Sequence, residues 1–517
     1  MFDLLTRFWI EFPLSYALTV GGLVSGYRRG GIPAEARLQR ALRASLPVML
    51  GVMIAWNCIV GVASPGRGTL ALRDLQVVLG ILFVLSSSAL TGAMLARWKP
   101  ASDLKRGTVL LDEADDESLA AGPDVLTIAG RPIPPLDETK HFKIIGTTGT
   151  GKTTVILELL TKALGRGDRA VIADPDGGYA RRFYDPDRGD VILNPFDSRA
   201  ARWDLFAEIQ ELQDADQLAR SFIADCEGES QIWRGFAQTY VSSILRQVHR
   251  SEDHNLGRLY HLLSTAKEDE LQGVLQGTPA MRFFGQEGGK FLHSVQSVAM
   301  QHLIGIEHLA RQSEGDLFSI RKWIREGRGV LFLPYRANEI ASLSSLISAW
   351  MRIAIFETMS GEEGDQRIWF VVDELDALGA IDGLKDALTR LRKFGGRCIL
   401  GLQSIAQVRG KYGDAQAQSI IENCGNTVIL RCSASERGGT AEFASRLIGQ
   451  RQVVRQQKSI SRLTFQFFRK TQTVSDHLFT EDAVMASEIE QLPDLSGFLK
   501  LASRPRWQRV TLTPTRQ

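Results

Sequence analysis

A glycine-rich octapeptide at residues 146–153 leaves this 517-residue chain few choices of fold. It reads GTTGTGKT, follows the apolar run HFKII (141–145) and precedes a helix that we expect over 154–164. This is the spacing GxxxxGK[ST] in a strand–loop–helix context. Glycines let backbone N–H groups curl around phosphates, and the start of the helix adds positive potential. The octapeptide therefore predicts an α/β nucleotide-binding domain.

The loop residues have individual expected roles. Lys152 would reach the β- and γ-phosphates, and the hydroxyl of Thr153 would ligate Mg²⁺. The predicted cofactors are ATP and Mg²⁺, and the alternative is a chance glycine-rich turn. The nucleotide-binding residues that we predict are Gly146, Thr147, Thr148, Gly149, Thr150, Gly151, Lys152, Thr153 and Thr154.

A second motif supplies the carboxylates that ATP hydrolysis needs. Residues 368–372 (IWFVV) are typical of a buried strand, and Asp373 and Glu374 follow directly. Asp373 would hold Mg²⁺ through water, and Glu374 would polarise the attacking water. Acidic residues also favour helix starts, so a helix cap is the alternative reading. The phosphate loop upstream favours the catalytic one.

A third strand is predicted over 398–402 and ends at Gln403. A polar side chain that closes the strand beside the Asp-Glu strand can sense the γ-phosphate, whereas the alternative is a turn amide. Between these strands lies a predicted helix, 384–393, with three cations in its last four residues. We choose Arg392 as an arginine finger that reaches a neighbouring subunit, with Arg390 and Arg431 as alternates. A solvated helix face is the competing interpretation.

The remaining pattern predicts a mainly parallel sheet with a helical insertion. Further strands are expected at 170–173, 191–193, 330–333 and 427–430. Residues 205–326 show helical spacing and no convincing strand, so we predict an all-α subdomain there. The nucleotide-binding domain would then comprise 101–204 and 327–517.

Residues 1–100 are predicted to form a membrane anchor. The runs 45–64 and 75–96 carry no charge, and each is long enough to span a hydrocarbon core of about 30 Å. A buried core helix is the alternative. Arginines precede the first run and basic residues follow the second, and basic flanks mark the cytoplasmic side. We expect a multi-pass protein of the bacterial inner membrane with both termini in the cytoplasm.

The charge balance limits how this chain can contact nucleic acid. The formal net charge is only +2, which argues against a simple cationic coat protein. Any contact with DNA must come from local patches. The segment 450–475 is one candidate, because it contains six Lys or Arg, three Phe and no acid. A solvated strand–turn segment explains the same residues equally well.

Taken together, these motifs resemble the type IV secretion coupling proteins, in their conjugative branch. The two apolar runs, IIGTTGTGKTT, the helical insertion, WFVVDELDAL and the strand end GLQS occur in the family's order. The segments DPDGGY (174–179), NPFD (194–197) and WDLF (203–206) make the likeness more specific.

The resemblance implies a RecA-like ATPase domain in a homo-hexamer at the inner membrane. Such proteins receive a relaxase-bound single strand of DNA from the relaxosome and pass it to type IV secretion channel proteins. By motif position, Lys152 and Thr153 would bind nucleotide and Mg²⁺, Asp373 and Glu374 would drive hydrolysis, and Gln403 would be the sensor. Arg392 would be the finger that acts on a neighbouring subunit.

Two other functions are compatible with the sequence. One is a chromosome-segregating DNA pump of the FtsK type, which normally has more membrane helices and a winged-helix end. The other is a membrane receptor that selects protein substrates for secretion and uses ATP only for assembly. Glu374 favours turnover and so disfavours the receptor.

Overall fold

A computed structural model describes 124–514, with gaps at 226–229, 254, 286–288, 365, 382, 436–438 and 463–469. It also describes 104–112, 122 and isolated positions between 16 and 91. The chain divides into two compact units, one of 1–105 with 453–479 and one of 106–452 with 480–517. The predicted membrane spans 45–64 and 75–96 lie largely outside the described residues.

A ten-stranded sheet forms the centre of the second unit, in the order β2-β17-β16-β13-β5-β12-β11-β6-β10-β7. The seven strands from β13 to β7 are parallel, as the sequence predicts. The strands of this sheet are β2 (Leu110–Leu111), β5 (Phe142–Ile145), β6 (Arg169–Pro175), β7 (Val191–Ile192), β10 (Val330–Tyr335), β11 (Ile368–Val372), β12 (Gly396–Leu402), β13 (Asn426–Ile429), β16 (Ser496–Lys500) and β17 (Trp507–Thr511).

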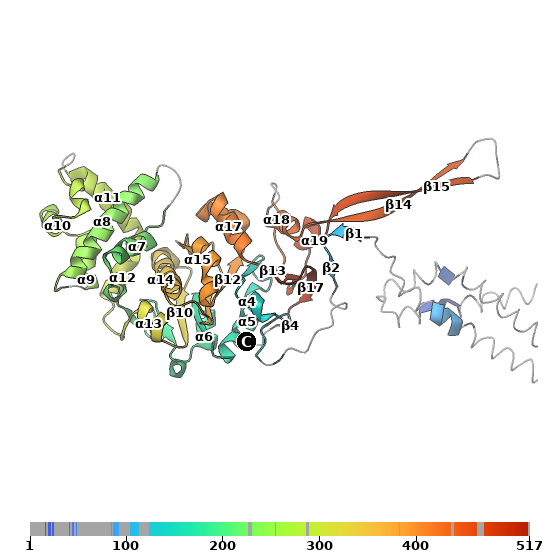
Figure 1. Cartoon of the computed structure of the whole chain (residues 1–517), viewed down its shortest axis with the longest axis horizontal. Helices are drawn as coiled ribbons and strands as arrows, with labels where there is room; N and C mark the ends of the chain where they lie inside the picture. The colour runs from blue at the N-terminus through green and yellow to red at the C-terminus, as the bar shows by residue number, and fades with distance from the viewer. Residues whose placement is uncertain are drawn as a thin grey trace, which may run out of the picture. The chain divides into compact units, whose positions relative to one another are not determined.

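Helices cover both faces of this sheet, and further helices form the insertion beside it (Figure 1). They are α4 (Pro135–Glu138), α5 (Lys152–Gly165), α6 (Gly178–Phe183), α7 (Leu212–Phe222), α8 (Ser230–Arg250), α9 (Leu256–Ser264), α10 (Glu268–Val274), α11 (Lys290–His302), α12 (Ile304–Arg311), α13 (Ile320–Glu326), α14 (Ile340–Ser360), α15 (Leu384–Arg390), α16 (Ile405–Tyr412), α17 (Asp414–Asn423), α18 (Gly439–Ile448) and α19 (Ala486–Glu490).

Alternation along β11 explains why its whole length is apolar. Ile368, Phe370 and Val372 belong to the hydrophobic core on one face of the sheet. Trp369 and Val371 belong to the core on the other face. A strand covered on both sides needs apolar residues at every position, whereas a strand at a solvated face alternates. The carboxylates that follow β11 are therefore delivered from the most buried part of the domain.

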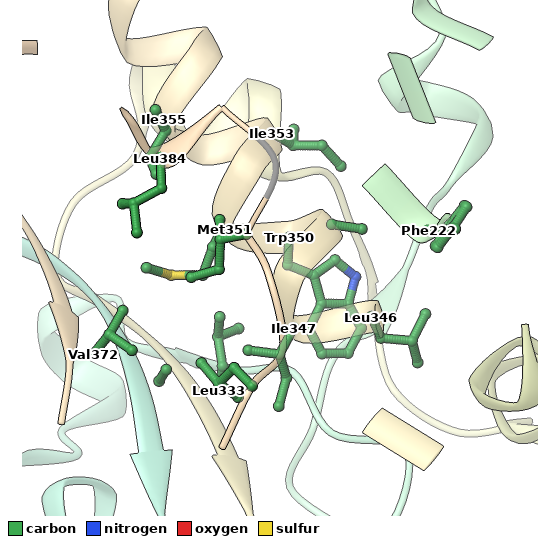
Figure 2. Close-up of a cluster of buried hydrophobic side chains, with 14 of the residues drawn as sticks. Phe222, Leu333, Leu346, Ile347, Trp350, Met351, Ile353, Ile355, Val372 and Leu384 are labelled. Carbon is green, nitrogen blue, oxygen red and sulfur yellow. The ribbon is translucent and has the colours of Figure 1, made fainter. Parts of the chain in front are cut away.

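Helix α14 joins the sheet to the helical insertion. Among the described helices, α14 is the one that is long and apolar enough to cross a membrane, but 67% of its most apolar stretch is buried inside the protein. Figure 2 shows Trp350 and Met351 of α14 beside Leu333 and Val372, which come from β10 and β11. The helix is therefore part of the core.

The segment 205–326 is helical from α7 to α13 and packs on α14, away from the β13–β17 side of the sheet (Figure 1). The expectation that it contains no strand is wrong. The two-residue strand β9 (Leu317–Phe318) pairs in parallel with β8 (Arg202–Trp203). A pairing of two residues is too short to produce a period-two pattern in the sequence.

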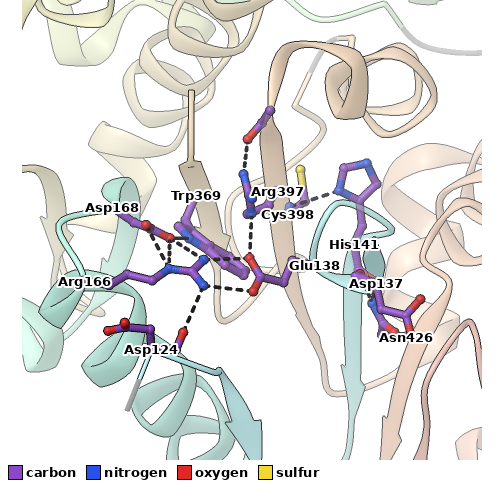
Figure 3. A network of polar contacts seen from close by, with 11 residues as sticks. Asp124, Asp137, Glu138, His141, Arg166, Asp168, Trp369, Arg397, Cys398 and Asn426 are labelled. Atoms are coloured by element: carbon purple, nitrogen blue, oxygen red, sulfur yellow. Dashed lines mark hydrogen bonds and ion pairs between the residues drawn. The ribbon is translucent and has the colours of Figure 1, made fainter. Parts of the chain in front are cut away.

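A buried ionic network fixes the edge of the sheet where the strands begin (Figure 3). Arg166, at the end of α5, donates to Glu138 at 2.6 Å and to Asp168 at 2.7 Å. Arg397 of β12 reaches the same Glu138 at 3.2 Å, and the indole N–H of Trp369 donates to Asp168 at 2.8 Å. Since every member has a partner of opposite charge or a hydrogen bond, α5 is held to two central strands.

The remaining strands belong to smaller sheets. β14 (Gln450–Arg462) and β15 (Lys470–Asp482) form a three-stranded sheet with β1 (Leu104–Gly107), in the order β1-β14-β15. β3 (Thr127–Ile128) pairs with β4 (Arg131–Pro132). The described parts of the predicted segment 450–475, namely 450–462 and 470–475, therefore lie on two strands. Its three Phe fall within 463–469, outside the described residues, as do the side chains of 455–476.

Candidate functional site

The phosphate loop lies between β5 and α5, as predicted, and its last glycine sets the start of the helix. Gly151 is the N-cap of α5 and has φ 114°, a conformation that favours glycine. A Cβ atom there would lie 2.9 Å from the side chain of Leu495. The N–H groups of the first turn of a helix have no partner within the helix, and Gly151 has no side chain that accepts from them. They are available to an anion.

Neighbouring strands hold the loop in place. The backbone N–H of Thr147 donates to the carbonyl of Arg431 at 2.9 Å, and the Thr147 hydroxyl donates to the same oxygen at 3.2 Å. Beneath the loop, the N–H of Leu495 donates to the carbonyl of Thr150 at 3.0 Å. Contacts from the chain just after β13 and just before β16 therefore hold the loop in its shape.

Lys152 lies across the loop that it belongs to. Its Nζ donates to the carbonyls of Gly146 at 2.9 Å and Thr147 at 3.2 Å. Burial lowers the pKa of Lys152, while the nearby carboxylates of Asp373 and Glu374 act in the opposite direction. The ammonium group thus sits beside the predicted phosphate position with its charge close to two acids.

The other loop residues lie as follows. Thr148 and Gly149 are exposed at the tip of the loop, and Gly149 has φ 78°. The hydroxyl of Thr150 is turned inward and donates to the carbonyl of Thr147 at 2.7 Å. Thr154 is half-buried in the first turn of α5. The structure therefore gathers all nine predicted nucleotide-binding residues at one loop and one helix start.

Asp373 meets the phosphate loop directly. The hydroxyl of Thr153 donates to Oδ2 of Asp373 at 2.9 Å, although the two residues are 220 positions apart in the chain. The hydroxyl of Tyr179 donates to the same oxygen at 2.8 Å. Oδ1 of Asp373 is buried and has no hydrogen-bond partner among the described residues. Two hydroxyl groups thus hold Oδ2 of Asp373, whereas Oδ1 can still accept a hydrogen bond or bind a cation.

Glu374 is connected to the loop through Gln403. The side-chain amide of Gln403 donates to Oε1 of Glu374 at 2.6 Å, and the Thr148 hydroxyl donates to the amide oxygen of Gln403 at 3.2 Å. Burial raises the pKa of Glu374, and the negative charge of Asp373 adds to this effect. A carboxylate with a raised pKa takes up a proton more readily, as a general base must.

Sequence reasoning missed three further residues at this edge of the sheet. Asp174 is the last residue but one of β6, and burial raises its pKa to about 6 despite hydrogen bonds from two backbone N–H groups of α6. Tyr179 follows on α6. Tyr335 ends β10, and its buried hydroxyl has no hydrogen-bond partner among the described residues. Burial and the facing carboxylates raise the pKa of Tyr335. The motif DPDGGY, which contains two of these residues, was the available signal.

Arg392 lies away from its own phosphate loop. It is exposed on η6 (Leu391–Phe394), which directly precedes β12, whereas the loop follows the end of β5. In a parallel sheet these positions are at opposite edges. Such a placement suits a residue that acts on another subunit, and its role there stays a prediction. Arg390 is also exposed, at the end of α15.

Arg431, the second alternate, lies beside its own loop. Its carbonyl accepts the bonds from Thr147, and its guanidinium forms an ion pair with Asp494 at 2.6 Å. The guanidinium is therefore engaged within the same chain, and Arg392 or Arg390 fits a role in a neighbouring subunit better.

The residues present fit a hydrated Mg²⁺ ion. Mg²⁺ prefers oxygen ligands and is usually bound by one or two protein groups together with substrate phosphates and water. Thr153 supplies a hydroxyl, and the buried Oδ1 of Asp373 supplies an acceptor without a partner among the described residues. Both lie next to the loop amides that suit phosphate.

A family model matches most of this chain. The model is that of the type IV secretion-system coupling protein DNA-binding domain, and it matches residues 125–513. The coupling protein TraD of Escherichia coli (strain K12) is 32% identical over 388 residues, which cover 73% of this chain and 53% of TraD. VirD4 of Agrobacterium fabrum is 24% identical, with 59% of this chain and 47% of VirD4 covered. The chain thus spans about half the length of the curated relatives it matches.

Solved structures show the same fold. An unbound form of the bacterial conjugative coupling protein TrwB superposes with a TM-score of 0.70 at 30% identity, covering 80% of this chain and 94% of that one. TrwB in complex with ADP and Mg²⁺ gives a TM-score of 0.69 at 30% identity, with the same coverage of both chains. The predicted α/β fold of a RecA-like nucleotide-binding domain is thereby confirmed.

Proposed function

Since the chain belongs to the family of type IV secretion-system coupling proteins, we propose that it hydrolyses ATP to move single-stranded DNA into a secretion channel. One observation carries the proposal. The Thr153 hydroxyl lies 2.9 Å from Asp373, so the phosphate loop and the acidic strand end form one site. TrwB, which has the same fold, is known in complex with ADP and Mg²⁺.

The residues of this chain would divide the work as follows. The loop amides and Lys152 bind the phosphates, and Thr153 and Asp373 hold Mg²⁺, which when bound neutralises phosphate charge. Glu374 takes a proton from the attacking water, and its raised pKa suits that task. Gln403 bonds to both Glu374 and Thr148. It can therefore couple the state of the nucleotide to β12, the strand that directly precedes Gln403.

Turnover would be completed between subunits. Arg392 would reach the γ-phosphate held by a neighbour in a homo-hexamer, since its position on its own chain is remote from its own loop. Loss of the γ-phosphate would release this contact. Movement of one subunit against the next would then shift the DNA strand along the ring.

The setting that we propose is the bacterial inner membrane. The uncharged runs 45–64 and 75–96 would anchor the protein with both termini in the cytoplasm, because basic residues flank them on that side. The partners would be a relaxase within its relaxosome, the single strand attached to it, and the proteins of the secretion channel. TrwB, a bacterial conjugative coupling protein with the same fold, supports a role in conjugation.

The family assignment disfavours an FtsK-type pump, because the match to the coupling-protein model extends over residues 125–513. The remaining alternative is a receptor for protein substrates that binds ATP only for assembly. Both hypotheses require ATP binding by Lys152, and they differ in whether transfer of DNA requires ATP hydrolysis and therefore Glu374.

A conjugation assay separates these alternatives. Strains that lack the native gene would be complemented with wild type, Lys152→Ala or Glu374→Gln, and with Lys411→Ala and Glu362→Gln as exposed controls of the same chemistry. We expect DNA transfer to be lost with both site variants and retained with both controls, at equal protein levels in the membrane. Undiminished DNA transfer with Glu374→Gln would contradict the proposal, and loss of transfer with Lys152→Ala alone would favour the receptor.

A further inference from the structure

Tyr179 holds the predicted metal carboxylate by one oxygen only. Its hydroxyl donates to Oδ2 of Asp373 at 2.8 Å, and Thr153 donates to the same atom at 2.9 Å. Oδ1 of Asp373 has no hydrogen-bond partner among the described residues although it is buried. Two donors on one oxygen fix the rotation of the carboxylate. The other oxygen is left available to a cation or its water.

The tyrosine is itself held by the neighbouring strand. Asp174 accepts from the backbone N–H of Tyr179 at 3.0 Å and of Ala180 at 2.7 Å, which fixes the start of α6 to the end of β6. β6 pairs with β11 in parallel, with Val372 opposite Ala173. Asp174 and Asp373 therefore leave adjacent strands at the same level.

The surroundings leave the Tyr179 ring little freedom. Its side chain is buried, with 2% exposed, and packs in the core on the α5 face of the sheet. Its hydroxyl is consequently placed by the fold, and it would keep its position when the loop binds a ligand. A phenylalanine would preserve this packing and remove only the donor.

We propose that Tyr179 is a positioning residue for Asp373, one that orients the carboxylate so that Oδ1 faces the Mg²⁺ site. This inference rests on the proposed nucleotide site. It goes beyond that site because it assigns a function to the DPDGGY segment, 194 residues away in the chain from the acid that it serves. Tyr179 would touch neither the nucleotide nor the reacting atoms, and it would act through the Asp373 carboxylate that it holds.

The test compares Tyr179→Phe with Tyr240→Phe in the full chain. Tyr240 is also fully buried and hydrogen-bonded, donating to the carbonyl of Leu262 at 3.1 Å, but it lies on α8 in the helical insertion. Binding of a fluorescent ADP analogue would be measured at increasing Mg²⁺ and in EDTA. Thermal unfolding in EDTA would report the structural cost of each change.

We expect Tyr179→Phe to raise the Mg²⁺ concentration for half-maximal binding by about tenfold, the effect of losing a hydrogen bond to a charged group. Binding in EDTA and binding at saturating Mg²⁺ should match wild type, and Tyr240→Phe should leave the Mg²⁺ midpoint unchanged. A wild-type Mg²⁺ midpoint in Tyr179→Phe would overturn the assignment of Tyr179. A weaker affinity in EDTA as well would assign it a purely structural role and likewise overturn the proposal. If wild type itself binds ADP without any effect of Mg²⁺, the proposed nucleotide site is the part that fails.

Discussion

Replacing Gly401 by alanine should damage the acidic strand end through the backbone. Gly401 lies on β12, and a Cβ atom there would be 1.9 Å from the carbonyl oxygen of Asp373 and 3.0 Å from its Oδ1. Ordinary contacts of a Cβ atom begin at 3.4 Å. The neighbour is backbone and cannot rotate away. β11 and β12 must therefore separate where Asp373 and Glu374 are delivered.

The cost follows from this overlap. Overpacking a well-packed core costs about 1–3 kcal/mol, and we expect the upper end here, about 3 kcal/mol, because main chain must move. The N–H of Leu375 donates to the carbonyl of Gly401 at 3.1 Å, so separation of the strands also weakens this bond. Displacement of Asp373 should in addition break its bonds to Thr153 and Tyr179.

Chemical denaturation of the full chain, followed by tryptophan fluorescence, measures the stability term. Gly410→Ala is the matched control, since Gly410 is exposed on α16 and a Cβ atom there meets nothing within 4 Å. The unfolding free energy of Gly410→Ala should rise by about 0.5–1 kcal/mol, because alanine favours the helix more than glycine does. Binding of Mg²⁺-nucleotide should fall in Gly401→Ala and stay unchanged in the control. Wild-type stability together with wild-type nucleotide binding in Gly401→Ala would refute the reasoning.

Three further predictions concern buried groups and the sensor. Burial lowers the pKa of His141 to about 4 from 6.5, so the unfolded chain takes up a proton first as pH falls; between pH 7.5 and 5 the unfolding free energy of wild type should drop about 2 kcal/mol more than that of His141→Gln. An equal drop in the unfolding free energy of wild type and His141→Gln between the two pH values would argue against this. Burial raises the pKa of Glu208 to about 7 from 4.5, so the folded state becomes less stable as pH rises and the carboxyl must ionise. Between pH 5 and 8 the unfolding free energy of Glu208→Gln should therefore rise by about 2 kcal/mol relative to that of wild type. A difference between the two proteins that does not change with pH would contradict this. Gln403→Ala should lower ATP turnover by at least about tenfold while ADP affinity, measured by fluorescence, stays unchanged, because Gln403 bonds to Glu374; equal turnover would exclude the sensor role.

The central strands could be predicted because a strand buried on both faces is a continuous run of apolar residues. The run 368–372 was expected as a strand and is β11, Ile368–Val372. The loop and the two acids were found for a related reason, since their spacing is set by local geometry at the ends of strands. The edge strand β7 was expected at 191–193, whereas β16, β17 and β2 on the other side of the sheet were not found. β16 and β17 pair antiparallel beside β13, and β2 is only two residues long, so neither local period nor length distinguishes them.

The supporting residues of the site could not be predicted for a different reason. Tyr179 and Asp373 are 194 positions apart, and nothing in the sequence near either residue indicates that their strands are neighbours. The same holds for Leu495, which packs against Gly151 although the two residues are far apart in the chain. Contacts of this kind depend on strand order. The sequence indicated that β12 lies beside β11, but the position of β6 on the other side of β11 was fixed only by the fold.

ATP hydrolysis measured with and without single-stranded DNA tests the central claim most directly. The full chain would be reconstituted in membranes, as wild type and as Glu374→Gln, with nucleotide binding measured on the same samples. We predict that DNA raises the turnover of wild type, and that Glu374→Gln binds ATP with no turnover under either condition. An ATP turnover of wild type that DNA does not change, or ATP turnover that persists in Glu374→Gln, would contradict the proposed function.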